Sequence, residues 1–163
     1  MTKRKIYLSV FILLLFAALY IGERLKQSEV PQLNLSTIVL KDLNGKPINL
    51  AAFLGNPMVI NFWGTWCGPC RKELPGFNSV KQKYNGRINF VLLSDEPVEQ
   101  LTAFRDANNY DFLYIQSQKK LNEMGIASVP VTFFYDAKGA FITVKKGDMS
   151  ERELEVMITG MIK

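Results

Sequence analysis

The chain has 163 residues, of which 48% are apolar and 12% aromatic, enough for one domain with a hydrophobic core and too apolar for a disordered chain. It contains no histidine and only two cysteines, which excludes histidine-activated nucleophiles, histidine-ligated metals, four-ligand zinc sites and disulfide-rich scaffolds. The net charge of +5 comes mostly from Lys3, Arg4 and Lys5, whereas residues 30–163 carry only +2, with both signs interspersed. Because no basic stripe is available to neutralise phosphates, we expect no nucleic-acid partner.

An uncharged segment, residues 6–22, follows these cations and predicts one transmembrane helix that acts as an uncleaved signal anchor. A cleaved signal peptide is the alternative, but its apolar region usually has about 7 to 15 residues and ends in small residues, which positions 19–21 lack. The cations predict a cytoplasmic tail over residues 1–5. Residues 23–35 then form a tether, and residues 36–163 form a domain outside the bacterial cytoplasmic membrane.

The domain begins with a predicted β-hairpin. Its strands, Thr37–Leu40 and Ile48–Leu50, flank an Asn44-Gly45 pair, which is a strong hairpin turn signal. The next segment, Met58 to Trp63, is short and almost wholly apolar, as expected for a central strand buried on both faces.

Strands and helices then alternate. We predict helices over 67–84, after Pro97, and over 121–124, strands over 88–93, 112–115, 131–135 and 140–145, and a final helix capped by Ser150 and Glu153. This order of elements predicts an α/β fold with a mixed central sheet and helices on both of its faces.

Both cysteines lie in the segment Trp66-Cys67-Gly68-Pro69-Cys70, directly after the central strand and at the start of a helix. Residues three apart on a helix share a face, so the two sulfurs can form a disulfide. Cys67 faces the unpaired N–H groups and the positive end of the helix, which lower the pKa of its thiol and favour the attacking thiolate. Cys70 lies one turn further and suits the resolving role, so the pair is predicted to be a redox-active disulfide.

Two other uses of the pair stay open. A structural disulfide is one, although so short a loop gains little closure entropy. Binding of Cu(I) by two soft thiolates is the other.

The segment from Phe62 to Pro75 resembles the active-site segment of membrane-anchored thioredoxin-like reductases of the TlpA/ResA type: it reads Phe-Trp-Gly-Thr-Trp-Cys-Gly-Pro-Cys-Arg-Lys-Glu-Leu-Pro. The resemblance extends over residues 34–162. It implies a thioredoxin-like fold with an N-terminal β-hairpin and an inserted strand–helix unit. It also implies an enzyme that exchanges dithiols and disulfides without a cofactor or a metal.

The resemblance also assigns residues around the cysteines. Ser128-Val129-Pro130 matches the cis-proline loop of the family, in which Pro130 packs beside the sulfurs and the Val129 backbone pairs with an extended substrate. A trans proline at the start of an edge strand is the alternative. Trp66 is a further candidate for substrate contact.

Asn61 stands where simple thioredoxins have a buried aspartate, and its side chain cannot titrate. Glu73, three residues after Cys70, matches a glutamate that members of the family use to tune the cysteines. The alternative is a carboxylate on the helix surface, favoured there by the helix dipole.

The family's function implies that the chain reduces protein disulfides outside the cytoplasm, with apocytochrome c as the leading substrate and a membrane-embedded dithiol protein as electron donor. The Gly68-Pro69 dipeptide, typical of reducing thioredoxins, agrees with that direction. The alternatives are a thioredoxin-like enzyme that reduces peroxides and a protein that delivers Cu(I) to an oxidase.

Overall fold

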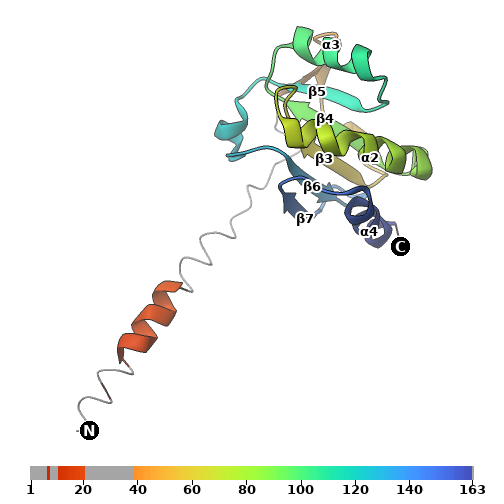
Figure 1. Cartoon of the computed structure of the whole chain (residues 1–163). Coiled ribbons are helices and arrows are strands. Elements are labelled where there is room, and N and C mark those ends of the chain that lie inside the picture. The colour runs from red at the N-terminus through yellow and green to blue at the C-terminus, as the bar shows by residue number, and fades with distance from the viewer. Residues whose placement is uncertain (1–6, 8–10, 21–38, 163) are drawn as a thin grey trace. The chain divides into compact units, whose positions relative to one another are not determined.

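The computed structural model of the chain describes residues 7, 11–20 and 39–162 (Figure 1). Contacts divide the chain into two units, Met1–Pro31 and Gln32–Lys163. In the first unit, residues 11–20 are α-helical. Within the described residues, no helix combines the length and the apolar character needed to cross a bilayer. The predicted tether and residues 6, 8–10, 21 and 22 of the predicted anchor lie outside the described residues.

The second unit contains seven strands, three α-helices and two 3₁₀ helices over its described part. In chain order these elements are β1 (Leu40–Asp42), β2 (Pro47–Ile48), η1 (Leu50–Phe53), β3 (Met58–Phe62), α2 (Gly68–Tyr84), β4 (Asn89–Ser94), α3 (Val98–Asn108), β5 (Leu113–Ser117), η2 (Leu121–Met124), β6 (Val131–Tyr135), β7 (Phe141–Lys146) and α4 (Glu151–Met161).

The strands form one mixed sheet in the order β2-β1-β5-β4-β3-β6-β7. Strands β3, β4 and β5 are parallel to one another, while β1 runs antiparallel to β5 and β6 runs antiparallel to both β3 and β7. The predicted hairpin, β1–β2, therefore extends one edge of the sheet. The predicted insertion is present as α3 and β5, between β4 and β6.

The three α-helices lie on one face of the sheet, whereas the sequence predicts helices on both faces; the 3₁₀ helices η1 and η2 contribute Leu50 and Leu121, which are buried outside the α-helical cluster. Leu74 of α2, Leu101 of α3 and Leu154 of α4 belong to a single core cluster. The cluster also contains Val59 of β3 and Trp63, the residue after this strand. For α2 and α3 the reason is the strand order. The chain moves across the sheet in one direction from β3 to β4 to β5, and right-handed crossovers in the same direction put their helices, α2 and α3, on the same face. Strand order depends on long-range pairing, which periodicity does not reveal.

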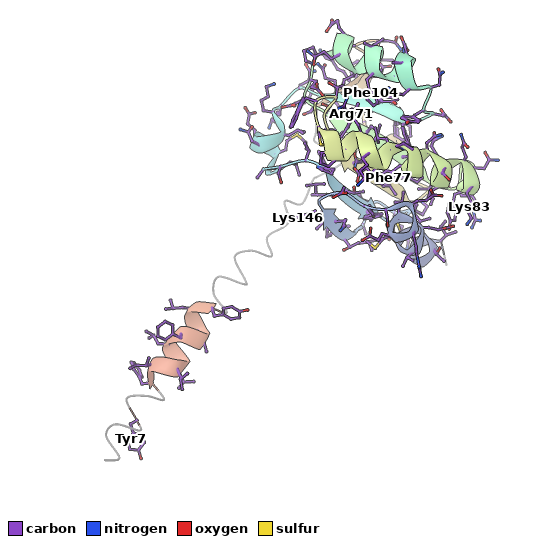
Figure 2. The ribbon with its side chains drawn as sticks, viewed as in Figure 1. Tyr7, Arg71, Phe77, Lys83, Phe104 and Lys146 are labelled. Carbon is purple, nitrogen blue, oxygen red and sulfur yellow. A yellow bond between two sulfur atoms is a disulfide. The ribbon has the colours of Figure 1, made fainter. Side chains whose placement is uncertain are left out.

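Side chains on the other face of the sheet are buried as well. Ile60 and Phe62 alternate with Val59 and Trp63 along the strand and are fully buried outside the helix-covered cluster. On the helix-covered face, Phe77 of α2 is buried and Phe104 of α3 packs against the cluster (Figure 2). The sheet is therefore a rigid base for the loops at its edges.

Helix ends follow the predicted caps closely. Ser150 precedes α4, and the reciprocal capping box with Glu153 is present, which confirms that prediction. Pro97 caps α3, and the turn η2 ends at Gly125, as expected. One difference concerns Leu50, which we placed in a strand. It begins η1 instead, because the Asn49 side chain accepts a hydrogen bond from Ala51 N and starts a helical turn there.

Candidate active site

Cys67 and Cys70 form a disulfide at the start of α2, with an S–S distance of 2.02 Å and a Cα–Cα distance of 5.2 Å. Cys67 is the N-cap of the helix, and its Sγ accepts a hydrogen bond from Cys70 N at 3.2 Å. Because the N-terminal N–H groups of a helix have no internal partners, they stabilise negative charge on a sulfur at this position when the pair is reduced. The predicted pairing is confirmed.

The two cysteines differ less in exposure than the sequence predicts. We expected Cys67 at an exposed helix start, but the residue is 4% exposed in the disulfide state, and Cys70 is fully buried. The loop before β6 shields Cys67 from solvent in part, since Val129 O lies 3.8 Å from Cys67 Sγ. A disulfide sulfur has no proton to donate, so this contact becomes a hydrogen bond only with the reduced thiol.

The peptide bond between Val129 and Pro130 is cis, as the resemblance implied. Gly147 N donates to Pro130 O at 2.9 Å, which ties this loop to the end of β7. The structure therefore brings Val129 to the cysteine pair and holds the loop at that place. Pro130 itself is buried.

Glu73 is not a surface carboxylate. Its residue is 5% exposed, and its carboxylate accepts hydrogen bonds from Asn61 Nδ2 at 2.8 Å and from Met149 N at 2.9 Å. Burial raises the pKa of this carboxyl from 4.5 to about 7, although both hydrogen bonds oppose the rise. Such a group can hold or release a proton near neutral pH, as a general acid–base catalyst must.

Asn61 orients Glu73 from the neighbouring strand. Its side-chain amide also donates to Thr132 Oγ1 at 2.9 Å, and the two residues lie opposite each other in the β3–β6 ladder. The side chain that replaces a titratable aspartate is thus a hydrogen-bond donor to the glutamate one layer above the sheet.

Trp66 stands beside the pair and is 70% exposed, more than any other large apolar side chain that the structure describes in residues 39–162. Its indole lies against Gly64: a Cβ atom there would lie 2.7 Å from Trp66 Nε1. Only glycine leaves room for the ring at this position. The exposed ring is therefore available to a molecule that approaches the disulfide.

Sequence reasoning missed one buried acidic residue near the site. Glu96, 7% exposed, accepts hydrogen bonds from Thr65 N at 2.7 Å and from Thr65 Oγ1 at 2.6 Å. A signal existed, because Asp95 and Glu96 follow β4 at the carboxyl end of a parallel strand, next to the end of β3. Among the residues that the structure describes, no three acidic or cysteine side chains are grouped as a metal site.

Comparisons with known proteins agree with this geometry. A model of the AhpC/TSA family matches residues 27–144. The thiol-disulfide oxidoreductase ResA of Bacillus thuringiensis subsp. konkukian is 30% identical over 165 aligned positions, which cover 95% of each protein. The thioredoxin-like protein YneN of Bacillus subtilis is 30% identical over 121 positions, or 71% of each.

Solved structures show the same fold. StoA from Bacillus subtilis superposes with a TM-score of 0.61 at 25% identity, over 74% of this chain and 94% of its own. A thiol:disulfide interchange protein from Chlorobium tepidum gives a TM-score of 0.67 at 21% identity, over 81% and 99%. With a Cys67–Cys70 disulfide at the start of a helix that follows the central strand, the chain belongs to the AhpC/TSA family of thioredoxin-like proteins and is a thiol–disulfide oxidoreductase.

Proposed function

We propose that this protein reduces disulfides in other proteins outside the cytoplasm. The observation that carries the proposal is the Cys67–Cys70 disulfide at a helix N-terminus, with the buried Glu73 carboxyl one turn further along the same helix. The ResA relative, named a thiol-disulfide oxidoreductase, supports the chemistry. The Gly68-Pro69 dipeptide between the cysteines supports the reducing direction.

The reaction consists of two exchanges. The Cys67 thiolate attacks one sulfur of the substrate disulfide, so that an S–S bond to Cys67 forms, the substrate S–S bond breaks, and one substrate thiolate leaves. Cys70 then attacks Cys67 Sγ, the Cys67–Cys70 disulfide forms, and the second substrate thiolate leaves. Two electrons pass to the substrate, and two protons from the reduced pair end on its thiols.

Glu73 manages one of those protons. Cys70 must lose its proton in order to attack, and Asn61 cannot accept it. The Glu73 carboxyl, with a pKa of about 7, accepts the proton directly or through a water and returns it to the leaving thiolate. Glu73, Cys67 and Cys70 are thus the proposed catalytic residues, and Trp66, Val129 and Pro130 the proposed substrate-binding residues.

A membrane tether completes the proposal. The uncharged segment 6–22 behind Lys3, Arg4 and Lys5 supports a single-pass anchor with the redox domain outside. In that compartment the oxidised pair needs electrons from a membrane-embedded dithiol protein, and apocytochrome c is the proposed substrate. Protease added to intact spheroplasts should digest the domain; full protection, or a soluble species cleaved near Gly22, would contradict the tether.

Trapping of mixed disulfides tests the function in cells. In the full chain, Cys70→Ser should accumulate substrates linked to Cys67, because the second exchange is blocked. Cys67→Ser is the matched control and should trap far less, since it lacks the attacking thiol. Equal trapping by the two variants would reject the assignment. If purified wild-type protein consumed hydrogen peroxide but left protein disulfides intact, the peroxide-reducing alternative would replace this proposal.

A further inference from the structure

A buried carboxylate outside the proposed catalytic set holds the loop that carries Trp66. Glu96 follows β4, and its side chain crosses to the loop between β3 and α2. There Glu96 Oε2 accepts from Thr65 N at 2.7 Å, and Oε1 accepts from Thr65 Oγ1 at 2.6 Å. Ser94 Oγ also lies 3.2 Å from Oε2. No cation pairs with Glu96 within the described residues, so these donors are what compensate its burial.

The same carboxylate lies next to the exposed indole. A Cβ atom at Gly64 would lie 2.7 Å from Trp66 Nε1 and 3.3 Å from Glu96 Oε2, so the ring and the carboxylate flank one point of the backbone. Trp66 is 70% exposed and has no described aromatic partner to hold it in place. The Gly64–Trp66 loop is closed by a hydrogen bond from Cys67 N to Gly64 O at 3.0 Å and is held to the end of β4 by the anchor at Thr65.

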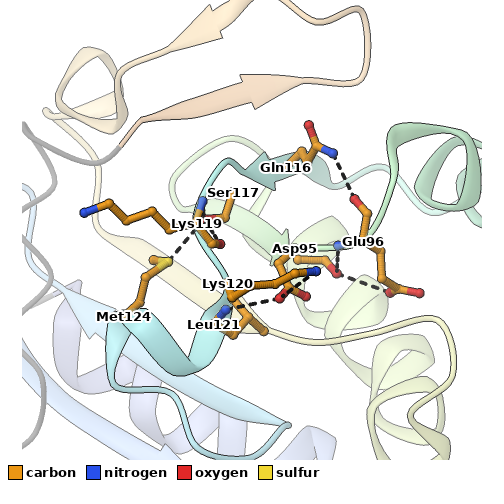
Figure 3. A network of polar contacts seen from close by, with 9 residues as sticks. Asp95, Glu96, Gln116, Ser117, Lys119, Lys120, Leu121 and Met124 are labelled. Carbon is orange, nitrogen blue, oxygen red and sulfur yellow. Dashed lines mark hydrogen bonds and ion pairs between the residues drawn. The ribbon is translucent and has the colours of Figure 1, made fainter.

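Glu96 is itself held firmly. Gln116 Nε2 donates to Glu96 O at 3.1 Å, and the neighbouring Asp95 accepts from Leu121 N at 3.2 Å (Figure 3). Asp95 thus fixes the start of η2, the turn that leads toward Val129, while Glu96 fixes the loop of Trp66.

We infer that Glu96 is a positioning residue for protein substrates: by holding Thr65 it fixes the Trp66 ring beside the disulfide, where the ring contacts the extended segment of a substrate. Glu96 does not touch the sulfurs in this arrangement, and the exchange chemistry does not pass through it. The inference rests on the proposed function, because it assigns specificity to the same site. It predicts that loss of Glu96 weakens binding of a peptide disulfide more than reaction with a small one.

The test compares Glu96→Ala, Glu96→Gln and wild-type full-length protein on two probes. One is a synthetic peptide closed by a Cys–Cys disulfide, and the other is bis(2-hydroxyethyl) disulfide, which has no side chain to meet Trp66. Glu96→Ala should raise the KM for the peptide on the order of tenfold, the effect of losing charge-assisted hydrogen bonds, and change kcat with the small disulfide much less. Glu96→Gln should restore most of the binding, because its amide can still accept from Thr65 N while the Thr65 hydroxyl turns to accept from the amide.

Acrylamide quenching supplies a readout that a merely structural residue would not change. Trp66 is exposed and Trp63 is buried, so the quenchable fluorescence reports Trp66. Glu96→Ala should alter this quenching, whereas Asp95→Ala, the matched control in the same segment, should not. If Glu96→Ala fails to fold, Thr65→Val carries the test, since it removes one of the hydrogen bonds and leaves the carboxylate in place.

The outcomes separate the inference from the function on which it rests. Unchanged peptide KM and unchanged Trp66 quenching in Glu96→Ala, or in Thr65→Val when that variant is used, would overturn the positioning role. A Glu96→Gln variant as impaired as Glu96→Ala would also overturn it, because the charge and not the anchor would then matter. Failure of the wild-type protein to reduce even the small disulfide would instead reject the proposed function.

Discussion

Burial and two hydrogen bonds have opposite effects on the pKa of Glu73. The bonds from Asn61 and Met149 favour the carboxylate, while burial favours the neutral acid and raises the pKa of the group to about 7. Near neutral pH the side chain is therefore divided between its two forms. The aspartate that simple thioredoxins bury in β3 is absent, and the Asn61 that replaces it is hydrogen-bonded to this buried glutamate on α2.

Replacement of Glu73 should therefore slow disulfide exchange. Glu73→Gln keeps the shape of the side chain and removes its proton acceptor, so the rate should fall by about a hundredfold, the lower end of the range for general acid–base catalysis. The wild-type rate with a small disulfide should show an inflection near pH 7 that the variant lacks. Stopped-flow measurement of both proteins across neutral pH checks this. Glu99→Gln, an exposed position on α3, is the control, and superimposable profiles for Glu73→Gln would remove Glu73 from the mechanism.

The same pKa predicts how stability depends on pH. The folded protein keeps the Glu73 proton up to about pH 7, whereas the unfolded chain loses it at the ordinary value of 4.5. Between these values the folded state binds more protons, so its stability falls as the pH rises. Relative to Glu73→Gln, the free energy of unfolding of the oxidised wild-type protein should fall by about 3 kcal/mol from below pH 4.5 to above pH 7. Denaturant titrations at both ends of this range measure it. A constant difference between the two proteins would mean that Glu73 titrates normally.

Helix α4, the last helix of the fold, is connected to the site through Met149, the residue that precedes its N-cap. Met149 N, just before the Ser150 cap of α4, donates to Glu73, and Met149 and Leu154 are both buried, as in a hydrophobic staple. At Gly76 of α2, a Cβ atom would lie 3.0 Å from Glu151 Cβ, so the two helices pack closely. The position of Met149, and with it one partner of Glu73, depends on how α4 begins.

Loss of the α4 cap should therefore be felt in stability. Ser150→Ala removes the hydroxyl that accepts from Glu153 N, and the free energy of unfolding should fall by about 1 kcal/mol. Ser150→Asn should retain most of the wild-type stability, because asparagine is an equally good N-cap. Chemical denaturation of the three proteins measures the difference. An equal loss of stability in both variants would show that the N-cap hydrogen bond does not stabilise the helix.

The sequence predicts the elements of this fold better than their arrangement. Local signals, such as the Ser150 cap, the Asn44-Gly45 turn and the apolar run of β3, depend on neighbours in the chain and are confirmed. The face on which α3 packs depends on the order of the strands, which no local pattern contains. The Leu50 turn was missed because the hydrogen bond from Ala51 to Asn49 competes with strand propensity.

The candidate site shows the same division. The cysteine pair and the cis peptide bond before Pro130 were predicted, since the first follows from residue spacing and the second from a motif. The burial of Glu73 was not, because it needs Asn61 and Met149, 12 and 76 residues away in the chain, to close over the carboxylate. Glu96 was missed for the same reason: its partner Thr65 lies 31 residues away.

At the scale of the whole molecule, the domain presents one disulfide beyond the carboxyl end of β3, an interior strand of the sheet. Its sulfurs lie between the loop of Trp66 and the loop of Val129, and Cys70 is fully buried behind Cys67. A substrate that approaches Cys67 therefore meets these two loops. In an oxidising compartment, the direction of exchange is then set by the reduction potential of the pair against that of its partners.

That reduction potential tests most directly the central claim that this protein reduces disulfides. Equilibration of the full chain with mixtures of reduced and oxidised dithiothreitol, followed by alkylation of Cys67 and Cys70, gives the value. A reductase with the Gly68-Pro69 dipeptide should have a potential near or below that of thioredoxin, about −270 mV. A value near that of the oxidant DsbA, about −120 mV, would contradict the claim, because the pair would then take electrons from protein thiols and not donate them.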